Sequence, residues 1–587
     1  MPHDMIRRGL NPHALPLQLA LLGALFLLYA LVNIPLWDLT YWDFGDGNYL
    51  YVGARMNDGL VPYRDILAPQ PPLHLALAAL AQKVGVLVAD SQLIGARLYC
   101  LLVRLAQAAL IYVAARQVFG CMARAIMAAG VYLFLPIGFW WGLCLQSENI
   151  EIVFLMAAFC GLLTLRTRWV VWAGVASALA MHCNMTGVPY FLVNALFLLC
   201  RRPRLAVPYI TAALGVWGLG AALAYAWAGF PYLDNVVLNQ VGSFPNPEIL
   251  AASGSSLPEY VWGKWRSQGF EVLVLEAPFL LLAALSLALG TRERLREFGD
   301  DPNADGYRRW EFAAWSALGM WLSIGFTAKG GTANYIFVLG EPAVALFAAD
   351  GLVRGRRTLA RLIRREKAEP AEPAPAFWPD LLADMKSIRF GATLGFLRPL
   401  FLVLAVAFGI FTGWLVFQNT QTALKGQIPH NFATNLWLTT EGLQSELPEP
   451  GVRQMMRLID QTTQPGDPIL APPFYAWATD RKVAGELAEN YLWQIKWMNE
   501  QFYVTKGTGE EGEGMLKMQE VAAMLRRREI PLLLLDLRQT GRVPVIADAV
   551  ARHYVELPGS PFQSRNTQLG LFVPQGADVP EESDWRF

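Results

Sequence analysis

The most informative part of the sequence lies between residues 37 and 93 and contains Asp46-Gly-Asn-Tyr-Leu-Tyr-Val-Gly-Ala-Arg55, Gly59-Leu-Val-Pro-Tyr-Arg-Asp65 and Gln70-Pro-Pro-Leu73. The first of these strings predicts a helix, because Tyr49, Val52 and Met56 recur at spacings of three and four. A turn follows at residues 57–59, and the proline pair begins a second, apolar helix over residues 73–88. The segment is too long for a simple connection between two helices.

The chain on both sides of this segment is apolar enough to lie in a membrane. It has 587 residues, of which 54% are hydrophobic and only 16% are charged, whereas soluble domains carry about 25% charged residues. This composition excludes a soluble enzyme and a disordered scaffold. A spanning helix needs roughly 20 apolar residues. On that basis we predict about eleven spans, at residues 15–36, 94–115, 125–143, 149–165, 169–183, 186–200, 205–228, 271–290, 311–327, 333–349 and 399–417.

Lysine and arginine are unevenly distributed over the connections between these spans. With the N-terminus placed in the cytoplasm, the connections on that side hold 24 Lys and Arg residues, and the outer connections before residue 418 hold 6. Cytoplasmic loops of membrane proteins are the more basic ones. The sequence therefore predicts a cytoplasmic N-terminus and, with an odd number of spans, an extracytoplasmic C-terminal tail. The total of 48 basic and 48 acidic residues gives no indication of nucleic-acid binding.

The apolar helix at residues 73–88 precedes a span that runs from outside to inside, so it cannot cross the membrane without reversing the charge pattern. We therefore expect both helices of the segment between residues 37 and 93 to lie along the outer membrane surface. Helices in that position suit a protein that acts on a substrate carried by a lipid. The first apolar run has no small-residue cleavage site, and we expect it to remain as a helix.

The chain divides into four parts. Residues 1–350 alternate apolar helices with loops, residues 351–398 form a basic cytoplasmic loop with a Pro/Ala/Glu-rich linker, and residues 399–417 form the last membrane helix. Residues 418–587 are polar and amount to one small domain. The predicted fold is a mostly α-helical, polytopic membrane bundle with a small extracytoplasmic α/β domain.

The polar tail has its own pattern of secondary structure. Its short apolar runs predict buried strands at residues 468–471, 531–536 and 569–573. Residues 513–528 predict a helix between the first and second of these strands. No motif in the tail indicates an activity.

The strings of the first outer segment resemble the first outer loop of polytopic GT-C glycosyltransferases, especially the bacterial branch that includes the aminoarabinose transferase and the protein mannosyltransferases. Later pieces occur in the same order as in that family, namely Arg97 at the start of the next span, Phe119-Gly120 at its end, Ser147-Glu148-Asn149, and Lys329-Gly-Gly-Thr-Ala-Asn-Tyr335. The resemblance covers residues 15–350 and does not extend to the tail.

The resemblance implies a specific reaction and a specific base. Such enzymes transfer a sugar, with inversion, from a polyprenyl-phosphate carrier to a lipid, glycan or protein at the outer face of the bacterial plasma membrane. The acid of the first outer loop is the expected base, and this role falls on Asp46, with Asp43 as the alternative. The resemblance also implies substrate contacts for Tyr49 and Gln70. A helix N-cap is the structural alternative for Asp46.

The sequence departs from the aminoarabinose branch at three of these positions. Gly47 stands where that branch has Glu, Gln70 where it has a basic residue, and Asn184 where a Lys is common. These changes affect the expected phosphate and substrate contacts, and they leave the acid at position 46 in place.

Transfer to a hydroxyl needs a base and partners for the leaving phosphate. The candidate phosphate-binding residues are Lys329, Arg64 and Arg55, with Tyr335 as a hydroxyl donor. Snorkelling at a helix end is the alternative explanation for Lys329. The chemistry requires no cofactor, because Lys and Arg can supply the positive charge. No Cys/His spacing indicates a metal site, although a divalent cation would be compatible with the reaction.

Acids and arginines near membrane depth are further candidates, because charge there is costly and is often functional. Glu148, where the fourth span begins, is a second catalytic candidate that would orient the acceptor or tune Asp46. A helix cap formed with Ser147 explains its position equally well. Arg97 and Arg104 lie within the second span and are expected to pair with acids that the sequence does not identify.

Two other classes of protein remain open from the sequence. A transporter or flippase of lipid-linked saccharides would show inverted repeats and helices broken at mid-membrane, and the interrupted region at residues 169–200 is the one feature of that kind. A non-catalytic assembly subunit would use the tail to bind a partner. The residues of the first outer segment favour the transferase over both alternatives.

Overall fold

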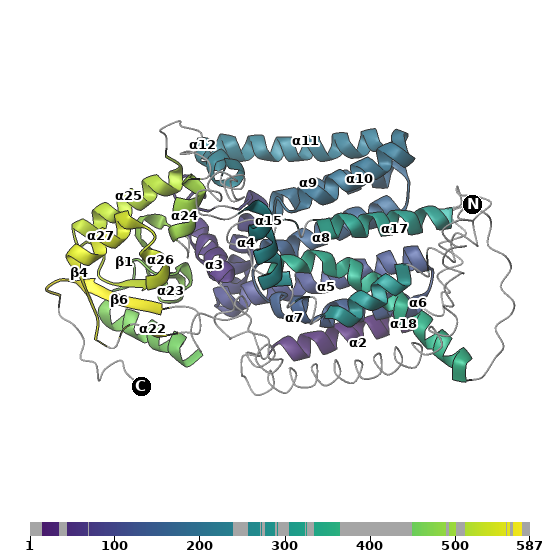
Figure 1. Cartoon of the computed structure of the whole chain (residues 1–587), viewed down its shortest axis with the longest axis horizontal. Helices are drawn as coiled ribbons and strands as arrows, with labels where there is room; N and C mark the ends of the chain where they lie inside the picture. Colours follow the sequence, from purple (N-terminus) through teal and green to yellow (C-terminus); the bar gives the residue numbers. More distant parts are fainter. Residues whose placement is uncertain are drawn as a thin grey trace.

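The computed structural model describes residues 15–34, 44–68, 70–238, 256–269, 272, 276–287, 290, 305–322, 325, 334–363, 449–488, 492–500, 511–558, 560, 562–563 and 568–577. The described chain is elongated, with a helical bundle along most of its length and an α/β unit (residues 449–577) at one end (Figure 1). The predicted span at residues 399–417, Asp43 and Lys329 lie outside the described residues.

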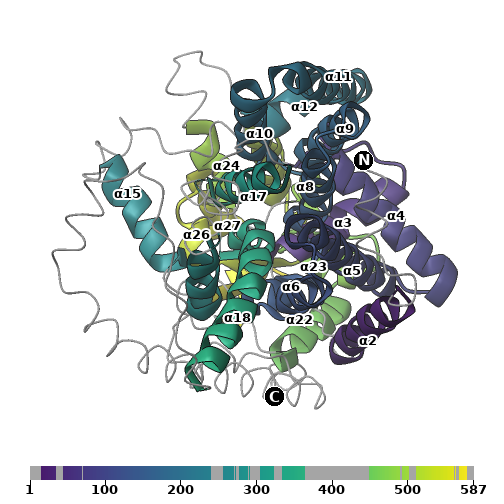
Figure 2. The same cartoon turned by 90° about the vertical axis from the view of Figure 1, so that its right-hand side faces the viewer.

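The bundle helices run along the long axis of the molecule, and Figure 2 shows α5, α8 and α17 end-on. They are α2 (Leu15–Asn33), α5 (Gln92–Phe119), α6 (Met122–Phe134), α7 (Pro136–Trp141), α8 (Ser147–Leu163), α9 (Thr167–Cys183), α10 (Gly187–Arg201), α11 (Pro203–Ala228), α17 (Asp305–Leu322) and α18 (Glu341–Ile363), together with the apolar helix Glu276–Leu287. Shorter elements connect them: α12 (Phe230–Leu233), η2 (Asp234–Leu238), α15 (Leu257–Lys264), η3 (Trp265–Gly269) and η5 (Asn334–Gly340).

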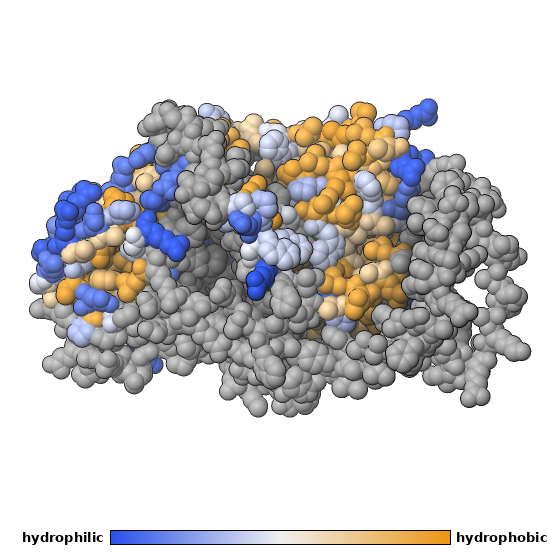
Figure 3. All heavy atoms as spheres, viewed as in Figure 1, coloured by the Kyte–Doolittle hydropathy of each residue, from blue (hydrophilic) through white to orange (hydrophobic). Residues whose placement is uncertain are grey.

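The surface of the bundle is suited to lipid. Five described helices are long and apolar enough to cross a membrane, namely Pro16–Asn33, Pro72–Ala89, Gln92–Phe119, Pro203–Ala228 and Ile336–Arg354. The peripheral helices α2 and α11 leave large apolar side chains exposed, among them Leu28, Leu219 and Leu223. Figure 3 shows apolar residues on the bundle and hydrophilic residues over much of the α/β unit. Apolar surface of this extent belongs in a bilayer, and the chain is a multi-pass membrane protein.

The prediction of one helix over residues 125–143 is wrong. α6 ends at Phe134, and α7 begins at Pro136. Proline has no N–H to donate and its ring clashes with the preceding turn, so proline inside an α-helix kinks or breaks it. Leu135, which precedes the proline, has the extended backbone that this position favours (ψ 132°). The predicted spans at 15–36, 94–115, 149–165 and 205–228 correspond to α2, α5, α8 and α11.

The interrupted region at residues 169–200 is a turn between two helices. α9 ends at Cys183 and α10 begins at Gly187. In the turn, Asn184 donates hydrogen bonds to Ser147 and Glu148 at the start of α8. The interruption therefore lies at the end of the bundle where α8 begins, and it is not the mid-membrane break that is typical of transporters.

The first outer segment forms the two predicted helices, α3 (Phe44–Asn57) and α4 (Pro72–Ala89). α4 is long and apolar enough to span a membrane, but Figure 2 shows it from the side where α5 and α8 are seen end-on. Its direction thus agrees with a position along the membrane surface. α4 meets α5 closely, since a Cβ on Gly95 would lie 2.5 Å from the Cα of Gly85. Glycine at both positions permits this contact.

A mixed sheet lies in the α/β unit. β6 (Gln568–Pro574) pairs antiparallel with β3 (Leu533–Asp536), β4 (Tyr554–Glu556) and β5 (Phe562–Gln563), with Leu533 opposite Phe572. β1 (Pro468–Ile469) pairs parallel with β2 (Lys482–Val483), and a bridge from Leu470 to Leu533 joins these two strands to β3. The helical elements are α22 (Glu449–Thr462), α23 (Pro473–Ala478), η6 (Ala484–Glu486), α24 (Leu492–Asn499), α25 (Glu513–Arg526), α26 (Leu537–Thr540) and α27 (Pro544–His553).

The predicted elements of the tail are confirmed. The strand predictions at residues 468–471, 531–536 and 569–573 correspond to β1, β3 and β6, and the predicted helix corresponds to α25. Continuous apolar runs mark these strands, because each is buried from both sides in the unit. The burial of Leu533, Leu534 and Leu571 agrees with that pattern.

The first outer segment and the α/β unit share one apolar core. A single cluster of buried side chains contains Tyr51, Ile66 and Leu67 from the outer segment together with Ile469, Phe474, Leu525 and Leu533 from the α/β unit. Figures 1 and 2 both show α3 next to α23 of the α/β unit. The α/β unit therefore completes its core with residues that lie about 400 positions earlier in the chain.

Candidate functional site

Buried polar side chains gather where the starts of α3, α4, α5 and α8 lie near the turn from α9 to α10. Each is at most 7% exposed, and they are Asp46, His74, Arg97, Gln146, Ser147, Glu148, Asn149, Glu151, Asn184 and Thr186. We call this set the polar cluster. It contains two of the predicted catalytic acids, and it lies at the end of the bundle nearest the α/β unit.

Asp46 and Arg97 form the strongest contact of the polar cluster. The two guanidinium nitrogens of Arg97 donate to the two carboxylate oxygens of Asp46, at 2.9 Å and 2.6 Å. The backbone N–H of Leu145 also donates to Asp46, at 2.6 Å, and Arg97 donates to the carbonyl of Leu143 at 2.9 Å. Bidentate pairs of this kind are strong and directional. The carboxylate of Asp46 is thus oriented by α5 and by the connection from α7 to α8.

Asp46 lies in the first turn of α3, which begins at Phe44. The main interaction of its side chain is the ion pair with Arg97, and not the helix N-cap that is the structural alternative from the sequence. The neighbouring glycines permit close packing on both sides. A Cβ on Gly45 would lie 2.5 Å from the side-chain nitrogen Nε2 of Gln146. A Cβ on Gly47 would lie 2.5 Å from the Cβ of Phe474.

Glu148 is buried and accepts hydrogen bonds from neutral groups. Asn184 donates to one of its oxygens at 2.8 Å, and the hydroxyl of Ser147 donates to the other at 3.1 Å. The predicted helix cap is not formed by these residues, because Gln146 is the N-cap of α8 and no side chain caps that end. The side chain of Glu148 instead ties α8 to the turn between α9 and α10.

Glu151 lies one turn after Glu148 on the same helix. One of its oxygens accepts from the hydroxyl of Thr186 at 2.6 Å, and the other has no hydrogen-bond partner among the described residues. Gly187 lies beside this second oxygen, since a Cβ there would be 3.1 Å from it. A buried carboxylate oxygen without a partner is costly, and it marks this part of the polar cluster as suited to a donor from a ligand.

Tyr49, the predicted substrate contact in α3, is buried against His74 of α4. The two rings meet edge to face, with centroids 4.3 Å apart. Gln70, the other predicted substrate contact, accepts a hydrogen bond from the hydroxyl of Tyr63 through its backbone carbonyl. The side-chain oxygen of Gln70 is buried and has no partner among the described residues.

The candidate phosphate-binding residues do not join the polar cluster in the described part of the chain. Arg55 binds Glu486 of the α/β unit and Asp58. Arg64 is exposed and pairs with Asp65, and the guanidinium of Arg64 lowers the pKa of that carboxyl. Tyr335 lies in η5, where only its backbone is described. Lys329 lies outside the described residues.

Arg97 is a cation of the site whose acid partner only the structure identifies. The sequence marks it as an arginine in an apolar span, and such a residue must pair with an acid. The partner is not evident from the sequence because Asp46 lies 51 residues earlier on another helix. Among the described residues, no group of three or more His, Cys, Asp and Glu side chains could hold a metal ion.

No protein-family profile matches the chain, and no curated protein matches it in sequence. Among solved structures, the chain is similar to ArnT from Cupriavidus metallidurans, crystallised with undecaprenyl phosphate. The TM-score is 0.50 at 13% identity, and the match covers 93% of this chain and 97% of that one. The oligosaccharyltransferase of Archaeoglobus fulgidus in its apo form matches at a TM-score of 0.45 and 11% identity, over 96% of this chain and 75% of that one.

The second likeness has a TM-score below 0.5 and does not establish a common fold. The first covers nearly the whole of both chains, including the tail that the sequence did not match to anything. The polytopic helical bundle with an α/β unit at its end is therefore the fold of the aminoarabinose transferase ArnT, as the resemblance to the GT-C glycosyltransferases predicted.

Proposed function

We propose that this protein is a membrane glycosyltransferase that moves a sugar from a polyprenyl-phosphate donor to an acceptor hydroxyl. The observation that carries the proposal is the oriented, buried carboxylate of Asp46 at the end of a bundle with the fold of ArnT. ArnT was crystallised with undecaprenyl phosphate, and we infer a lipid-phosphate donor of the same class for this chain. A fold alone does not fix a reaction, so the acid supports the proposal independently of the likeness.

In the proposed reaction, the acceptor oxygen attacks the anomeric carbon of the sugar. The bond between that carbon and the phosphate oxygen breaks, and the configuration inverts. The proton of the acceptor hydroxyl passes to Asp46, whose oxygens are oriented by Arg97 and the N–H of Leu145. The hydroxyl becomes more acidic as its new bond forms, which favours this transfer late in the step.

Glu148 and Glu151 are proposed to face the acceptor. Their described partners are neutral donors, namely Ser147, Asn184 and Thr186. A sugar or glycan acceptor offers several hydroxyl donors that suit such acceptor oxygens. Asp43 remains the alternative base, and Lys329 and Tyr335 remain the proposed phosphate contacts.

The proposed location is the bacterial plasma membrane, with the N-terminus in the cytoplasm and the α/β unit outside. The basic turns that follow α5, α8 and α10 support this orientation, since they lie at the end of the bundle opposite the α/β unit (Figure 1). Cytoplasmic loops carry most of the Lys and Arg in membrane proteins. The polar cluster would then face the outer leaflet.

Mass spectrometry of cell-envelope glycans, glycolipids and glycoproteins from the wild type and from an Asp46→Asn strain tests this proposal. We expect one hexose or pentose to disappear from one class of acceptor. Identical profiles with equal protein levels would contradict it. In purified form, turnover of a labelled undecaprenyl-phosphate sugar should release undecaprenyl phosphate and be insensitive to a chelator. A flippase, the alternative function, would move the same lipid and leave its sugar–phosphate bond intact.

A further inference from the structure

The helix that carries Asp46 is held between α4 and the α/β unit. On one side, Gln82 of α4 donates to the carbonyl of Leu50 at 3.0 Å, and Asn57 donates to the carbonyl of Ala79 at 2.9 Å. On the other side, Gly47 lies against Phe474, next to Asp46 itself. α3 therefore contacts α4 on one face and the α/β unit on another, and its position depends on both.

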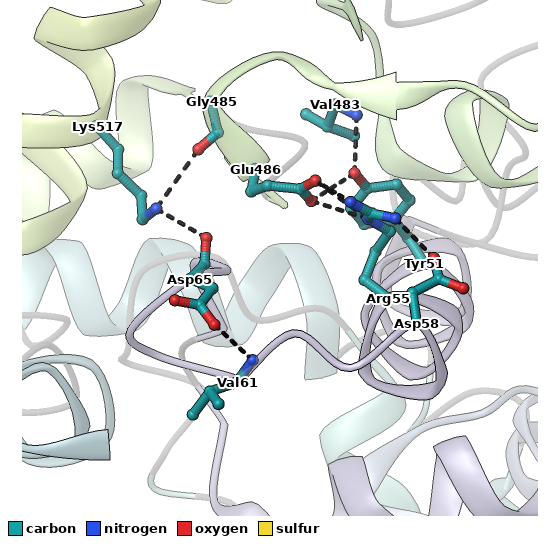
Figure 4. A network of polar contacts seen from close by, with 9 residues as sticks. All are labelled: Tyr51, Arg55, Asp58, Val61, Asp65, Val483, Gly485, Glu486 and Lys517. Atoms are coloured by element: carbon teal, nitrogen blue, oxygen red, sulfur yellow. Dashed lines mark hydrogen bonds and ion pairs between the residues drawn. The ribbon is translucent and has the colours of Figure 1, made fainter. Parts of the chain in front are cut away.

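The carboxylate of Glu486 contacts two side chains of α3, as Figure 4 shows. Its carboxylate accepts from Arg55 at 2.6 Å and 3.1 Å, and from the hydroxyl of Tyr51 at 2.6 Å. The same hydroxyl accepts from the N–H of Val483 at 2.8 Å. Burial raises the pKa of Tyr51, and the nearby carboxylate of Glu486 raises it further. The hydroxyl therefore stays protonated and continues to donate to Glu486.

The backbone around Glu486 is specialised for this contact. Gly485 and Glu486 have φ angles of +63° and +50°, in the left-handed region that side chains other than glycine rarely adopt. The carbonyl of Glu486 accepts from the N–H of Leu67 at 3.0 Å, and Lys517 donates to the carbonyl of Asp65 at 3.0 Å. A strained residue held in place on both sides is typical of a functional position.

We propose that Glu486 is a positioning residue for the transfer reaction, and that the α/β unit holds α3 in place through it, so that Asp46 faces the sugar. This inference rests on the proposed function, in which Asp46 is the base. Loss of the contact would leave substrate binding intact and would increase the motion of α3. It would thus lower the rate of the chemical step more than the affinity for the donor.

The test compares Glu486→Gln and the milder Tyr51→Phe with Asp58→Asn in the full-length chain in lipid nanodiscs. Asp58 is the matched control, because it binds the same Arg55 from the exposed side with its own side chain 60% exposed. The first measurement is hydrogen–deuterium exchange of the amides of residues 47–57. We expect faster exchange in Glu486→Gln, a smaller increase in Tyr51→Phe, and wild-type exchange in Asp58→Asn.

The second measurement is transfer from a labelled undecaprenyl-phosphate sugar. We expect kcat of Glu486→Gln to fall about tenfold, with KM for the donor within about twofold of the wild type, as for a loss felt mainly in the transition state. Glu486→Asp, which keeps the carboxylate, should recover part of kcat. A purely structural role predicts instead a loss of folded protein at unchanged kcat, and that outcome would overturn the proposal.

The two proposals fail in distinguishable ways. Wild-type exchange of α3 in Glu486→Gln would overturn the positioning role, and this assay needs no sugar substrate. Full transfer activity of Asp46→Asn would overturn the assignment of the base, and with it the catalytic part of the positioning proposal. Faster exchange combined with unchanged kcat would show that the α/β unit supports α3 for stability alone, which also contradicts the proposal.

Discussion

α5 carries two buried arginines, Arg97 and Arg104, that differ in what surrounds them. Arg97 pairs with Asp46 near the α/β unit and reaches the connection from α7 to α8. Arg104 lies about two turns further along. It pairs with Glu341 of α18 at 3.2 Å, donates to the carbonyl of Tyr132, and stands over the ring of that tyrosine at 3.8 Å.

The two arginines differ in role: Arg97 belongs to the candidate site, and Arg104 joins helices of the bundle. Arg104 joins three bundle helices, and Glu341 also binds the backbone N–H of Gly138 at the start of α7. Every partner of Arg104 named here belongs to the bundle. Asp46 instead belongs to a helix that also contacts the α/β unit, and it is a member of the polar cluster. We therefore expect changes at Arg97 and Asp46 to affect transfer, and changes at Arg104 to affect stability.

The largest expected effect comes from Asp46→Asn. Loss of a general base lowers the rate of transfer by about 100-fold to 10,000-fold, measured as turnover of a labelled undecaprenyl-phosphate sugar per folded molecule. Glu341→Gln is the matched control, because it breaks the equivalent pair on Arg104 and leaves the polar cluster intact. Turnover of Asp46→Asn within about threefold of the wild type would remove the base from the proposed mechanism.

A large effect on stability is expected from Arg104→Gln. Removing one partner of a buried pair lowers the free energy of unfolding by about 3–5 kcal/mol, because Glu341 is left buried without its cation. Thermal unfolding followed by tryptophan fluorescence in detergent measures this loss. Turnover per folded molecule should stay near that of the wild type. If Arg104→Gln and Arg97→Gln reduced turnover equally, the two arginines would not differ in the way the comparison requires.

A smaller effect is expected from Glu148→Gln, which keeps the shape of the side chain and removes its charge. Hydrogen bonds to charged groups contribute about 1.5–3 kcal/mol, which corresponds to roughly a 10-fold to 100-fold loss of turnover. The KM for the acceptor should rise, and the KM for the donor should stay constant. An increase in the donor KM alone would place Glu148 on the phosphate side of the site.

The smallest effect is expected from Asp65→Asn, in the turn after α3. Arg64 lowers the pKa of Asp65, with a contribution from the N–H of Val61. The carboxylate therefore stabilises the fold at pH values above its unfolded pKa, and this contribution is lost as the pH falls through the lower folded pKa. The wild type and Asp65→Asn should differ slightly in thermal midpoint at neutral pH and converge in strong acid. A difference that persists in acid would assign the effect to packing.

The sequence predicts the elements of this molecule better than their contacts. Apolar runs and proline positions place α2, α5, α11 and the strands β1, β3 and β6, because burial in lipid or in a sheet leaves a local pattern. The apolar run does not indicate the break at Pro136, because it continues across that residue. Proline alone does not mark a helix end either, since α11 continues through Pro208.

The sequence names Asp46 and Glu148 as candidate acids, and both lie in the polar cluster, while their catalytic roles stay a prediction. The sequence does not indicate the contacts that surround these helices, since Arg97 is 51 residues from Asp46 and Glu486 is 431 residues from Arg55. A single sequence does not show which distant residues are in contact. Arg55 therefore looked like a phosphate ligand, whereas in the structure its charge is neutralised by Glu486 and Asp58.

The shared core of the first outer segment and the α/β unit also constrains biosynthesis. α3 leaves the ribosome about 400 residues before α22, and at about 5–20 residues per second this leaves a delay of roughly 20–80 s. During that interval the apolar faces of Tyr51 and Leu67 have no partner from the α/β unit. A nascent chain that stops before residue 449 would present this unfinished surface to chaperones and proteases, so quality control can recognise the truncated product directly.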